Sequence, residues 1–534
     1  MSRTPFTHRQ VLVIFSGLMA CLLLSALDQT IVATTLPTIV GELGGFDYYS
    51  WVVTSYLLSA TVSTPLYGKI GDLYGRRIIF QVSILIFLIG SLLAGVAQDM
   101  LQLILSRGVQ GIGAGGLITM TFSVIGDILS PRQRGRYIGL LAGVWAFASA
   151  VGPFIGGFIA DNFSWRWAFL INIPIGLIAL VVISNVLHLP IVRRQPRFDI
   201  TGALLMVTGI SCLLLVLVWG GSEYPWSSLI ICGLALAGIA VLVFFIIWEA
   251  QATEPILPLH LFRNSIFSVS AVLGLLTGCA LFISIIFIPL FLQVVMGVSA
   301  THSGLLLLPL TAGVVTGSVG SGRIISYTGR YRFWPIFGLA FSAVGMYLLS
   351  MMQGNTLLGL SSLYMVIFGL GLGVTMQVTI LAAQNAVDYQ DLGVATSTVQ
   401  FFRQMGGAFG VATFGTIMNT RLKDELIVRV PSYALAEVGG DVNQLLSSPA
   451  MIRTLSPSVA SGISASVEIA IHSVFLWSVP MLVLAFVLSW FLKEIPLGET
   501  VGQTVPIDGF KQQEFPLVRS ISESTGNKQA KTLF

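Results

Sequence analysis

Charged side chains are scarce in this 534-residue chain. Asp, Glu, Lys and Arg make up 9% of the residues, while 55% are hydrophobic. A typical soluble domain is about 25% charged, so these charges are too few to cover the surface of a soluble protein of this length. The composition therefore excludes a soluble enzyme and a disordered protein, and it indicates a multi-pass membrane protein.

Cysteine and histidine are also scarce. The four cysteines lie in separate apolar stretches without a CxxC pair, and the five histidines are dispersed, so we expect neither a disulfide framework nor a metal site. A GxGxxG pattern over residues 111–116 lies inside an apolar run, and no soluble strand precedes it. We expect no cofactor, no metal and no enzymatic activity.

Long uncharged runs recur along the chain. A bilayer crossing needs about 20 mostly apolar residues, and β-barrel strands would be half as long and would alternate in polarity. The runs predict an all-α membrane protein with 14 transmembrane helices. Their expected centres lie near residues 22, 59, 88, 113, 149, 177, 210, 238, 280, 312, 342, 370, 408 and 482.

The basic residues predict the orientation. An even number of spans places both termini on one side, together with the loops that carry most of the 27 Lys and Arg residues. Because such loops are cytoplasmic, we expect both termini in the cytoplasm and the chain in the plasma (cell inner) membrane. The segment 421–470 is then a polar outer loop, and 495–534 a cytoplasmic tail. Basic residues in short loops argue against a nucleic-acid partner.

A short pattern occurs twice. Glycine, a base, isoleucine, glycine and arginine recur at the same spacing in residues 68–77 and 322–331, 254 residues apart. The repeat predicts two homologous six-helix bundles, over 1–190 and 261–494, with two inserted linker helices in 191–260. Two facing bundles are typical of a transporter whose site lies at their interface.

Five motifs carry a resemblance to a known family. They lie in order along the predicted helices: Leu27 to Pro37 with Asp28; Gly68, Asp72, Gly75, Arg76 and Arg77; Arg107, Gln110, Gly111 and Gly113; Gly152, Pro153, Gly156 and Gly157; and Trp165 to Trp167 with Asn172, Pro174 and Gly176. With these motifs the chain resembles the major facilitator superfamily, and within it the fourteen-span drug:proton antiporters, the QacA/EmrB-like branch.

The resemblance implies a proton-coupled exporter of lipophilic, chiefly cationic, drugs or toxic compounds, working by alternating access. An exporter of one endogenous lipid, amino acid or siderophore remains an alternative, as does a membrane receptor or channel. The expected partners are a small-molecule substrate, protons and the lipid bilayer, and we expect a monomer.

Asp28 and Arg107 are charges inside predicted spans. A charge there costs roughly 3 kcal/mol on insertion scales, and desolvation favours the protonated form of Asp28. We expect this carboxyl to exchange a proton and, once charged, to attract a cationic substrate. Arg107 lies at a similar depth and is expected to tune that exchange, while Gly111 and Gly115 open space beside it.

The remaining candidates are predicted from pattern or resemblance. Asp72 with Arg76 and Arg77, on a turn shaped by Gly68 and Gly75, would form a cytoplasmic latch. Gly152, Pro153, Gly156 and Gly157 match the antiporter motif, either for packing or as a pivot. Aromatic and amide side chains are candidates for the substrate cavity: Trp145, Phe147, Gln377, Gln384, Gln400 and Phe401.

Overall fold

The computed structural model describes residues 7–43, 49–187, 198–221, 224–298, 300–430 and 456–497. Over these ranges the chain is helical, apart from turns, short connections and one isolated β-bridge between Gly220 and Tyr224. The predicted all-α class is thus confirmed for the described residues. Most of the predicted tail, from residue 498 onward, lies outside them.

The N-terminal half contains six long helices and one short one. Several begin in ways that the sequence explains: Asp99 caps α4 by accepting the Gln102 backbone N–H at 2.8 Å, and Pro131 starts α5 at a position that needs no N–H. The helices are α1 His8–Leu43, α2 Tyr49–Tyr74, α3 Arg76–Gly95, α4 Met100–Ile128, α5 Pro131–Asn162, α6 Trp167–Leu170 and α7 Asn172–Val186.

Two helices follow, and then the C-terminal half. The pair is α8 Ile200–Trp219 and α9 Leu229–Glu249. The C-terminal half comprises the helices η2 Leu259–Arg263, α10 Ser265–Leu290, η3 Phe291–Val295, α11 Ala300–Leu306, α12 Leu308–Thr328, α13 Phe333–Leu349, α14 Leu358–Asn385, η4 Tyr389–Asp391, α15 Leu392–Arg429 and α19 Pro457–Ser489.

Each predicted helix centre falls inside one of the long helices. By length and composition, eleven described helices can cross a membrane, and α13 is a shorter apolar helix. The two other long helices, α2 and α15, are not among the eleven. They pack against each other and carry polar side chains between them. A count of fourteen crossings remains a prediction.

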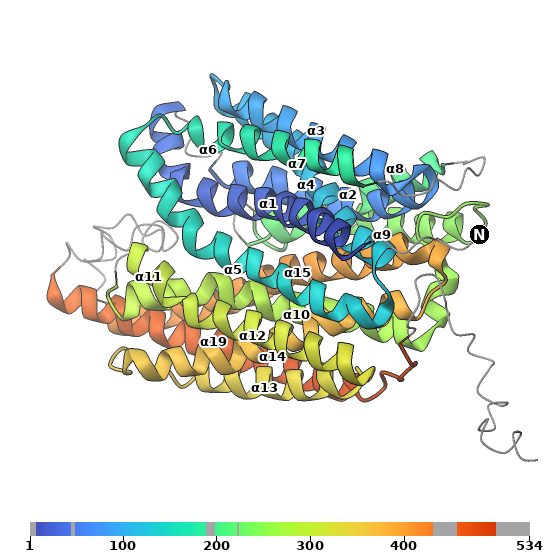
Figure 1. Ribbon diagram of the computed structural model, residues 1–534. Helices are drawn as coiled ribbons and strands as arrows, with labels where there is room; N and C mark the ends of the chain where they lie inside the picture. Colours follow the sequence, from blue (N-terminus) through green and yellow to red (C-terminus); the bar gives the residue numbers. More distant parts are fainter. Residues whose placement is uncertain are drawn as a thin grey trace, which may run out of the picture.

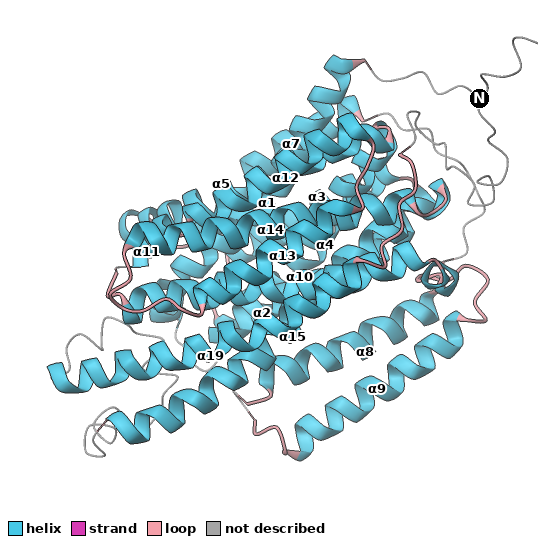
Figure 2. Ribbon diagram, turned by 90° about the horizontal axis from the view of Figure 1, so that it is seen from below, coloured by secondary structure: helices cyan, strands magenta, loops and turns pink. Residues whose placement is uncertain are grey.

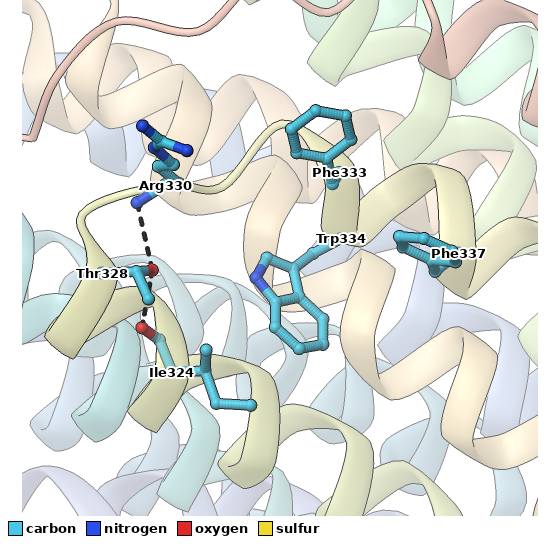
Figure 3. A pocket seen from close by; sticks show the side chains of 6 residues that line it. All are labelled: Ile324, Thr328, Arg330, Phe333, Trp334 and Phe337. Carbon is cyan, nitrogen blue, oxygen red and sulfur yellow. Dashed lines mark hydrogen bonds between the residues drawn. The ribbon is translucent and has the colours of Figure 1, made fainter.

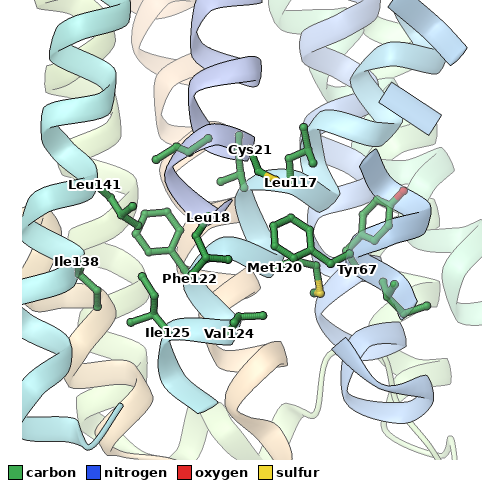
Figure 4. Packing of buried hydrophobic residues seen from close by; sticks show 14 of the residues in the cluster. Leu18, Cys21, Tyr67, Leu117, Met120, Phe122, Val124, Ile125, Ile138 and Leu141 are labelled. Carbon is green, nitrogen blue, oxygen red and sulfur yellow. The ribbon is translucent and has the colours of Figure 1, made fainter. Parts of the chain in front are cut away.

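The helices gather into two groups (Figure 1), with α1–α4, α6 and α7 in one and α10–α15 and α19 in the other. The central helix of the first group is α4, which is buried along most of its length. Around it lie Leu18 of α1, Tyr67 of α2 and Leu141 of α5 (Figure 4). The second group has its own hydrophobic cluster, and α5 packs on both α1 and α12.

The helices α8 and α9 lie at one edge of the molecule (Figure 2). Met206 and Ile210 of α8 share a hydrophobic cluster with Val62 of α2 and Met405 of α15. The inserted pair therefore covers one of the two interfaces between the groups. Its helices coincide with those predicted within 191–260.

One finding refines a predicted boundary, and a second concerns the two repeated loops. The outer loop expected over 421–470 is shorter, because α15 continues to Arg429 and α19 starts at Pro457. Apolar runs mark only the part of a helix that lies in lipid, so polar helix ends look like loop. Both repeated loops hold a glycine in the positive-φ region that favours glycine, with φ 97° at Gly75 and 72° at Gly329, but ψ is 126° at the first and 3° at the second, so the two turns differ.

Candidate functional site

The carboxylate of Asp28 lies in the interior of the N-terminal group. Its exposed fraction is 0%, and its Oδ2 atom accepts a hydrogen bond of 2.6 Å from Nη1 of Arg107, which is 1% exposed. The predicted proximity of these two charges, from α1 and α4, is thus present in the structure. An ion pair at this depth persists only when its remaining hydrogen-bonding atoms are satisfied as well.

Amide side chains satisfy those atoms. Oδ1 of Asp28 accepts from Nε2 of Gln110 at 2.7 Å and from Nδ2 of Asn172 at 3.0 Å. Both amides also donate to Oγ of Ser91, and Oε1 of Gln110 accepts from Arg107 at 2.6 Å. The Asp28 carboxylate thus accepts three hydrogen bonds, one from the Arg107 guanidinium and two from amides.

Aromatic rings cover the guanidinium of Arg107. Its Cζ atom lies 4.1 Å from the ring centre of Tyr56 and 5.8 Å from that of Phe169. Its Nε donates to the Val52 carbonyl at 3.3 Å. A cation held against two rings and a carbonyl is stabilised without water.

The position of this network bears on two expectations, and it corrects the one about the glycines. Its side chains come from α1, α2, α3, α4 and α7, so in this conformation every partner of Asp28 lies within the N-terminal group, and the attraction of a cationic substrate stays a prediction. The glycines at 111 and 115 do not open space beside Arg107. A Cβ atom at either would meet Ser59 or Ser63 of α2, so they let α2 and α4 approach closely.

The loop between α2 and α3 holds a second buried network. Arg76 Nη2 donates to Oδ1 of Asp72 at 2.6 Å, while Nη1 lies 2.8 Å from Oδ1 of Asp127 and from the Ser123 carbonyl oxygen. The side chains of the three charged residues are 8% exposed or less. Arg76 thereby joins α2, α3 and α4.

The acids of this network reach the other group. Oδ2 of Asp72 accepts the backbone N–H of Val394 at 3.0 Å, in the first turn of α15. No side chain of α15 itself caps that turn, so Asp72 caps it from across the interface and faces the positive end of the helix dipole. The Tyr389 hydroxyl donates to Asp127. The predicted latch therefore joins the two groups through Asp72, with Asp127 and Tyr389 as members that the sequence did not reveal.

The other predicted latch residues act separately. A Cβ atom at Gly68 would lie 2.1 Å from Oγ of Ser397, so the glycine allows α2 to touch α15. Gly75 is the single residue between α2 and α3 and has a positive φ of 97°. Arg77 donates to the Ser184 carbonyl at 2.5 Å, inside the N-terminal group. It anchors α3 to α7 and does not join the groups.

A matching interface lies between α5 and α12. Arg132 donates from Nε to the Ser326 carbonyl at 3.0 Å and from Nη2 to the Tyr327 carbonyl at 2.8 Å.

Gln377 of α14 donates to the Gly135 carbonyl. Gln384 donates to the Phe122 carbonyl at 3.2 Å and to Thr396 Oγ1 at 3.0 Å. Gln377 and Gln384 thus bridge the two groups near the repeated loops.

The antiporter motif brings α5 onto α1. A Cβ atom at Gly152 would lie 1.9 Å from Oγ1 of Thr30, and one at Gly156 would lie 2.0 Å from Oγ1 of Thr34. Nothing lies within 4 Å of such an atom at Gly157. The side chain of Pro153 lies outside the described set. Because Thr30 is two residues from Asp28, α1 connects the charge network to α5.

The remaining candidates for the substrate cavity differ in how much of each side chain is exposed. Trp145 and Phe401 are half-buried, Phe147 is 54% exposed, and Gln400 is fully buried. Neither amide atom of Gln400 has a hydrogen-bond partner among the described residues. Gln404, one helical turn further along α15, was not predicted as a site residue from the sequence. It accepts from Thr61 Oγ1 at 3.1 Å and donates to Thr64 Oγ1 at 3.2 Å, across the α2–α15 interface.

The geometry so far is that of two helical groups joined at one end, with a buried ion pair in one of them. A family model described as the Major Facilitator Superfamily matches residues 18–411. The chain belongs to the major facilitator superfamily. Its members are membrane transporters and not enzymes.

Relatives and solved structures agree with this membership. An MFS-type transporter of Mycobacterium tuberculosis H37Rv is 39% identical over 91% of this chain and 70% of its own length. The multidrug transporter protein MdtP of Bacillus subtilis is 37% identical over 93% of this chain and 96% of its own. The structure of the human organic anion transporter MFSD10 superposes with a TM-score of 0.58 at 15% identity, covering 91% and 100% of the two chains.

Proposed function

We propose that this transporter is a proton-coupled exporter of lipophilic, chiefly cationic, drugs or toxic compounds, from the fourteen-span antiporter branch. The observation that carries the proposal is the ion pair of Asp28 and Arg107, fully buried and enclosed by Gln110 and Asn172. The name of the similar Bacillus subtilis protein, a multidrug transporter, supports the substrate class.

The pairing sets the direction of the coupling. In this conformation Asp28 accepts hydrogen bonds from three donors, and the groups are joined at the end with the α2–α3 and α12–α13 loops. Protonation of Asp28 removes the charge that Arg107 requires, and so disfavours this conformation. By linkage, a conformation in which the pair has separated binds the proton more tightly. Protonation therefore drives the joined end open.

The change can reach the other bundle through α1 and α5. Asp28 and Thr30 lie on different faces of α1, and Thr30 donates to the Ala148 carbonyl of α5 at 3.2 Å. At its other end α5 is bonded to α12 through Arg132. A shift of α1 as the pair separates would thus move α5 against α12. We propose that residues 1–190 and 261–494 move as two bundles in this way.

Proton coupling is tested with the purified full chain in liposomes. A pH gradient imposed on vesicles loaded with ethidium or tetraphenylphosphonium should drive counterflow of the cation and the proton. Asp28→Asn should abolish that flux, because the amide cannot exchange a proton. A matched carboxylate control is Asp99→Asn, at the exposed start of α4, which should transport normally. A flux that is the same with and without the pH gradient, and the same in the parent protein and in Asp28→Asn, would refute proton coupling.

We further propose a plasma-membrane location with both termini in the cytoplasm, on the distribution of basic residues. Tyr327 is 84% exposed in the last turn of α12, and Leu357 is 77% exposed in the loop after α13. In a variant lacking the exposed Cys232, a membrane-impermeant thiol reagent should label Leu357→Cys on intact cells and Tyr327→Cys only after permeabilisation. The reverse pattern would invert the orientation.

A further inference from the structure

The second copy of the repeated loop leaves its arginine without an acid. Arg330 corresponds to Arg76 in the repeat, but Ser326 stands where the first copy has Asp72. Arg76 is buried between two carboxylates, whereas Arg330 is exposed, and only its backbone N–H has a partner, Oγ1 of Thr328 at 3.3 Å. Among the described residues, its guanidinium has no ion pair or hydrogen bond.

An apolar groove begins beside this arginine. It holds about 300 Å³, and its lining comes from the end of α12, the loop and the start of α13. Figure 3 shows the rings of Phe333, Trp334 and Phe337 along it and the Arg330 side chain at one end. Phe333 is 54% exposed and Phe337 59%. Aromatic rings beside a cation at the end of a membrane helix are typical of the headgroup level of a bilayer.

A second hollow, of about 440 Å³ and with a mixed polar and apolar lining, shares Thr328 and Arg330 with the groove. It is lined by Arg132 and Arg330 and by one acid, Glu494. Arg132 already donates to carbonyl oxygens. The free cation of Arg330 lies where the mixed hollow meets the apolar groove, and this arrangement fits a ligand with an anionic head and an apolar tail.

We propose that this groove binds one anionic phospholipid of the surrounding bilayer. Its phosphate would lie on the Arg330 guanidinium, and part of one acyl chain would lie against Phe333, Trp334 and Phe337. The proposal is independent of proton coupling at Asp28, since it concerns the outer face of the C-terminal bundle at the α12–α13 loop. It assigns the second copy of the repeat a role in anchoring that bundle at the membrane surface.

The test is lipid binding to the purified full chain in detergent, followed by native mass spectrometry during titration with phosphatidylglycerol or phosphatidylcholine. Arg330→Gln should weaken the tightest phosphatidylglycerol site about fivefold, since one arginine near a membrane surface is worth about that factor. Arg323→Gln is the control, because Arg323 is exposed on the same end of α12 but does not line the groove. It should change the affinity by less than twofold.

Two further arms separate the sources of binding. Phe337→Ala should weaken both lipids, because the acyl chain loses its contact, and inorganic phosphate should not displace the lipid. Equal effects of Arg330→Gln and Arg323→Gln would overturn the proposal in favour of diffuse charge. Displacement by phosphate alone would show a simple anion site. Equal affinity for phosphatidylcholine would remove the selectivity for anionic lipid.

Discussion

The two repeated loops differ in both backbone and electrostatics. Each contains a glycine with a positive φ, but ψ is 126° at Gly75 and 3° at Gly329. Both loops meet the opposite bundle at the same end of the molecule. In the first loop the carboxylate of Asp72 reaches across, held by a buried arginine. In the second loop, the Ser326 and Tyr327 carbonyls accept hydrogen bonds from the Arg132 guanidinium of α5, at a partly exposed position.

The difference indicates that the two interfaces contribute unequally to holding this end of the molecule together. Asp72 and Asp127 pair with Arg76 inside the N-terminal group, and each also accepts one hydrogen bond from the C-terminal group. Separation of the groups would leave these two buried acceptors without that bond, so the first loop favours the joined arrangement. Hydrogen bonds between a guanidinium and carbonyls near solvent are easily exchanged for water. We infer that the contacts between α2 and α15 contribute most of the free energy that keeps this end joined. The contacts between α5 and α12 contribute less. The close backbone approach is common to both.

The largest expected effect is at the two arginines of the repeat. Arg76→Met leaves Asp72 and Asp127 buried without their cation and should cost about 3–5 kcal/mol, a large fall in the melting temperature of the protein in detergent. Arg330→Met should leave the melting temperature almost unchanged without added lipid. Equal falls would contradict the proposed difference between the loops.

Glycine substitutions test what the loops share. A Cβ atom at Gly68 would lie 2.1 Å from Ser397 Oγ, and one at Gly322 would lie 2.3 Å from the Gly135 carbonyl oxygen. Gly68→Ala and Gly322→Ala should therefore lose similar stability, about 1–3 kcal/mol each, measured by thermal unfolding. Gly320→Ala, with open space around it, is the control. A loss at only one of the two sites would show that the interfaces differ in packing as well as in charge.

The smallest expected effect concerns the capping carboxylate. Asp72→Asn keeps an acceptor for the Val394 N–H but removes its charge, which should cost about 1 kcal/mol. The open population at this end should then rise about fivefold, measured from distances between spin labels at Tyr74→Cys and Tyr327→Cys. Ser326→Ala should have no effect, because only the Ser326 carbonyl accepts a bond. An effect of Ser326→Ala as large as that of Asp72→Asn would remove the distinction.

Sequence predicted the features that a local pattern encodes. Apolar runs located the helices, and the two charges inside those runs, Asp28 and Arg107, proved to be partners. Partners supplied by distant segments were not predictable, since Asn172, Asp127 and Tyr389 carry no local signal of their neighbours. Gln377 and Gln384 were expected to line a substrate cavity because they are polar and lie in the C-terminal half. Instead they donate to backbone carbonyls of α5 and α4, which no spacing encodes.

The central claim is that protonation of Asp28 separates it from Arg107 and opens the joined end. The most direct measurement needs no substrate: spin-label distances between Tyr74→Cys and Tyr327→Cys, recorded over a range of pH in the full chain and in Asp28→Asn. The account predicts that lowering the pH lengthens the distance in the parent protein, and that Asp28→Asn keeps the long distance at every pH. A distance that changes with pH equally in both proteins, or in neither, would contradict it.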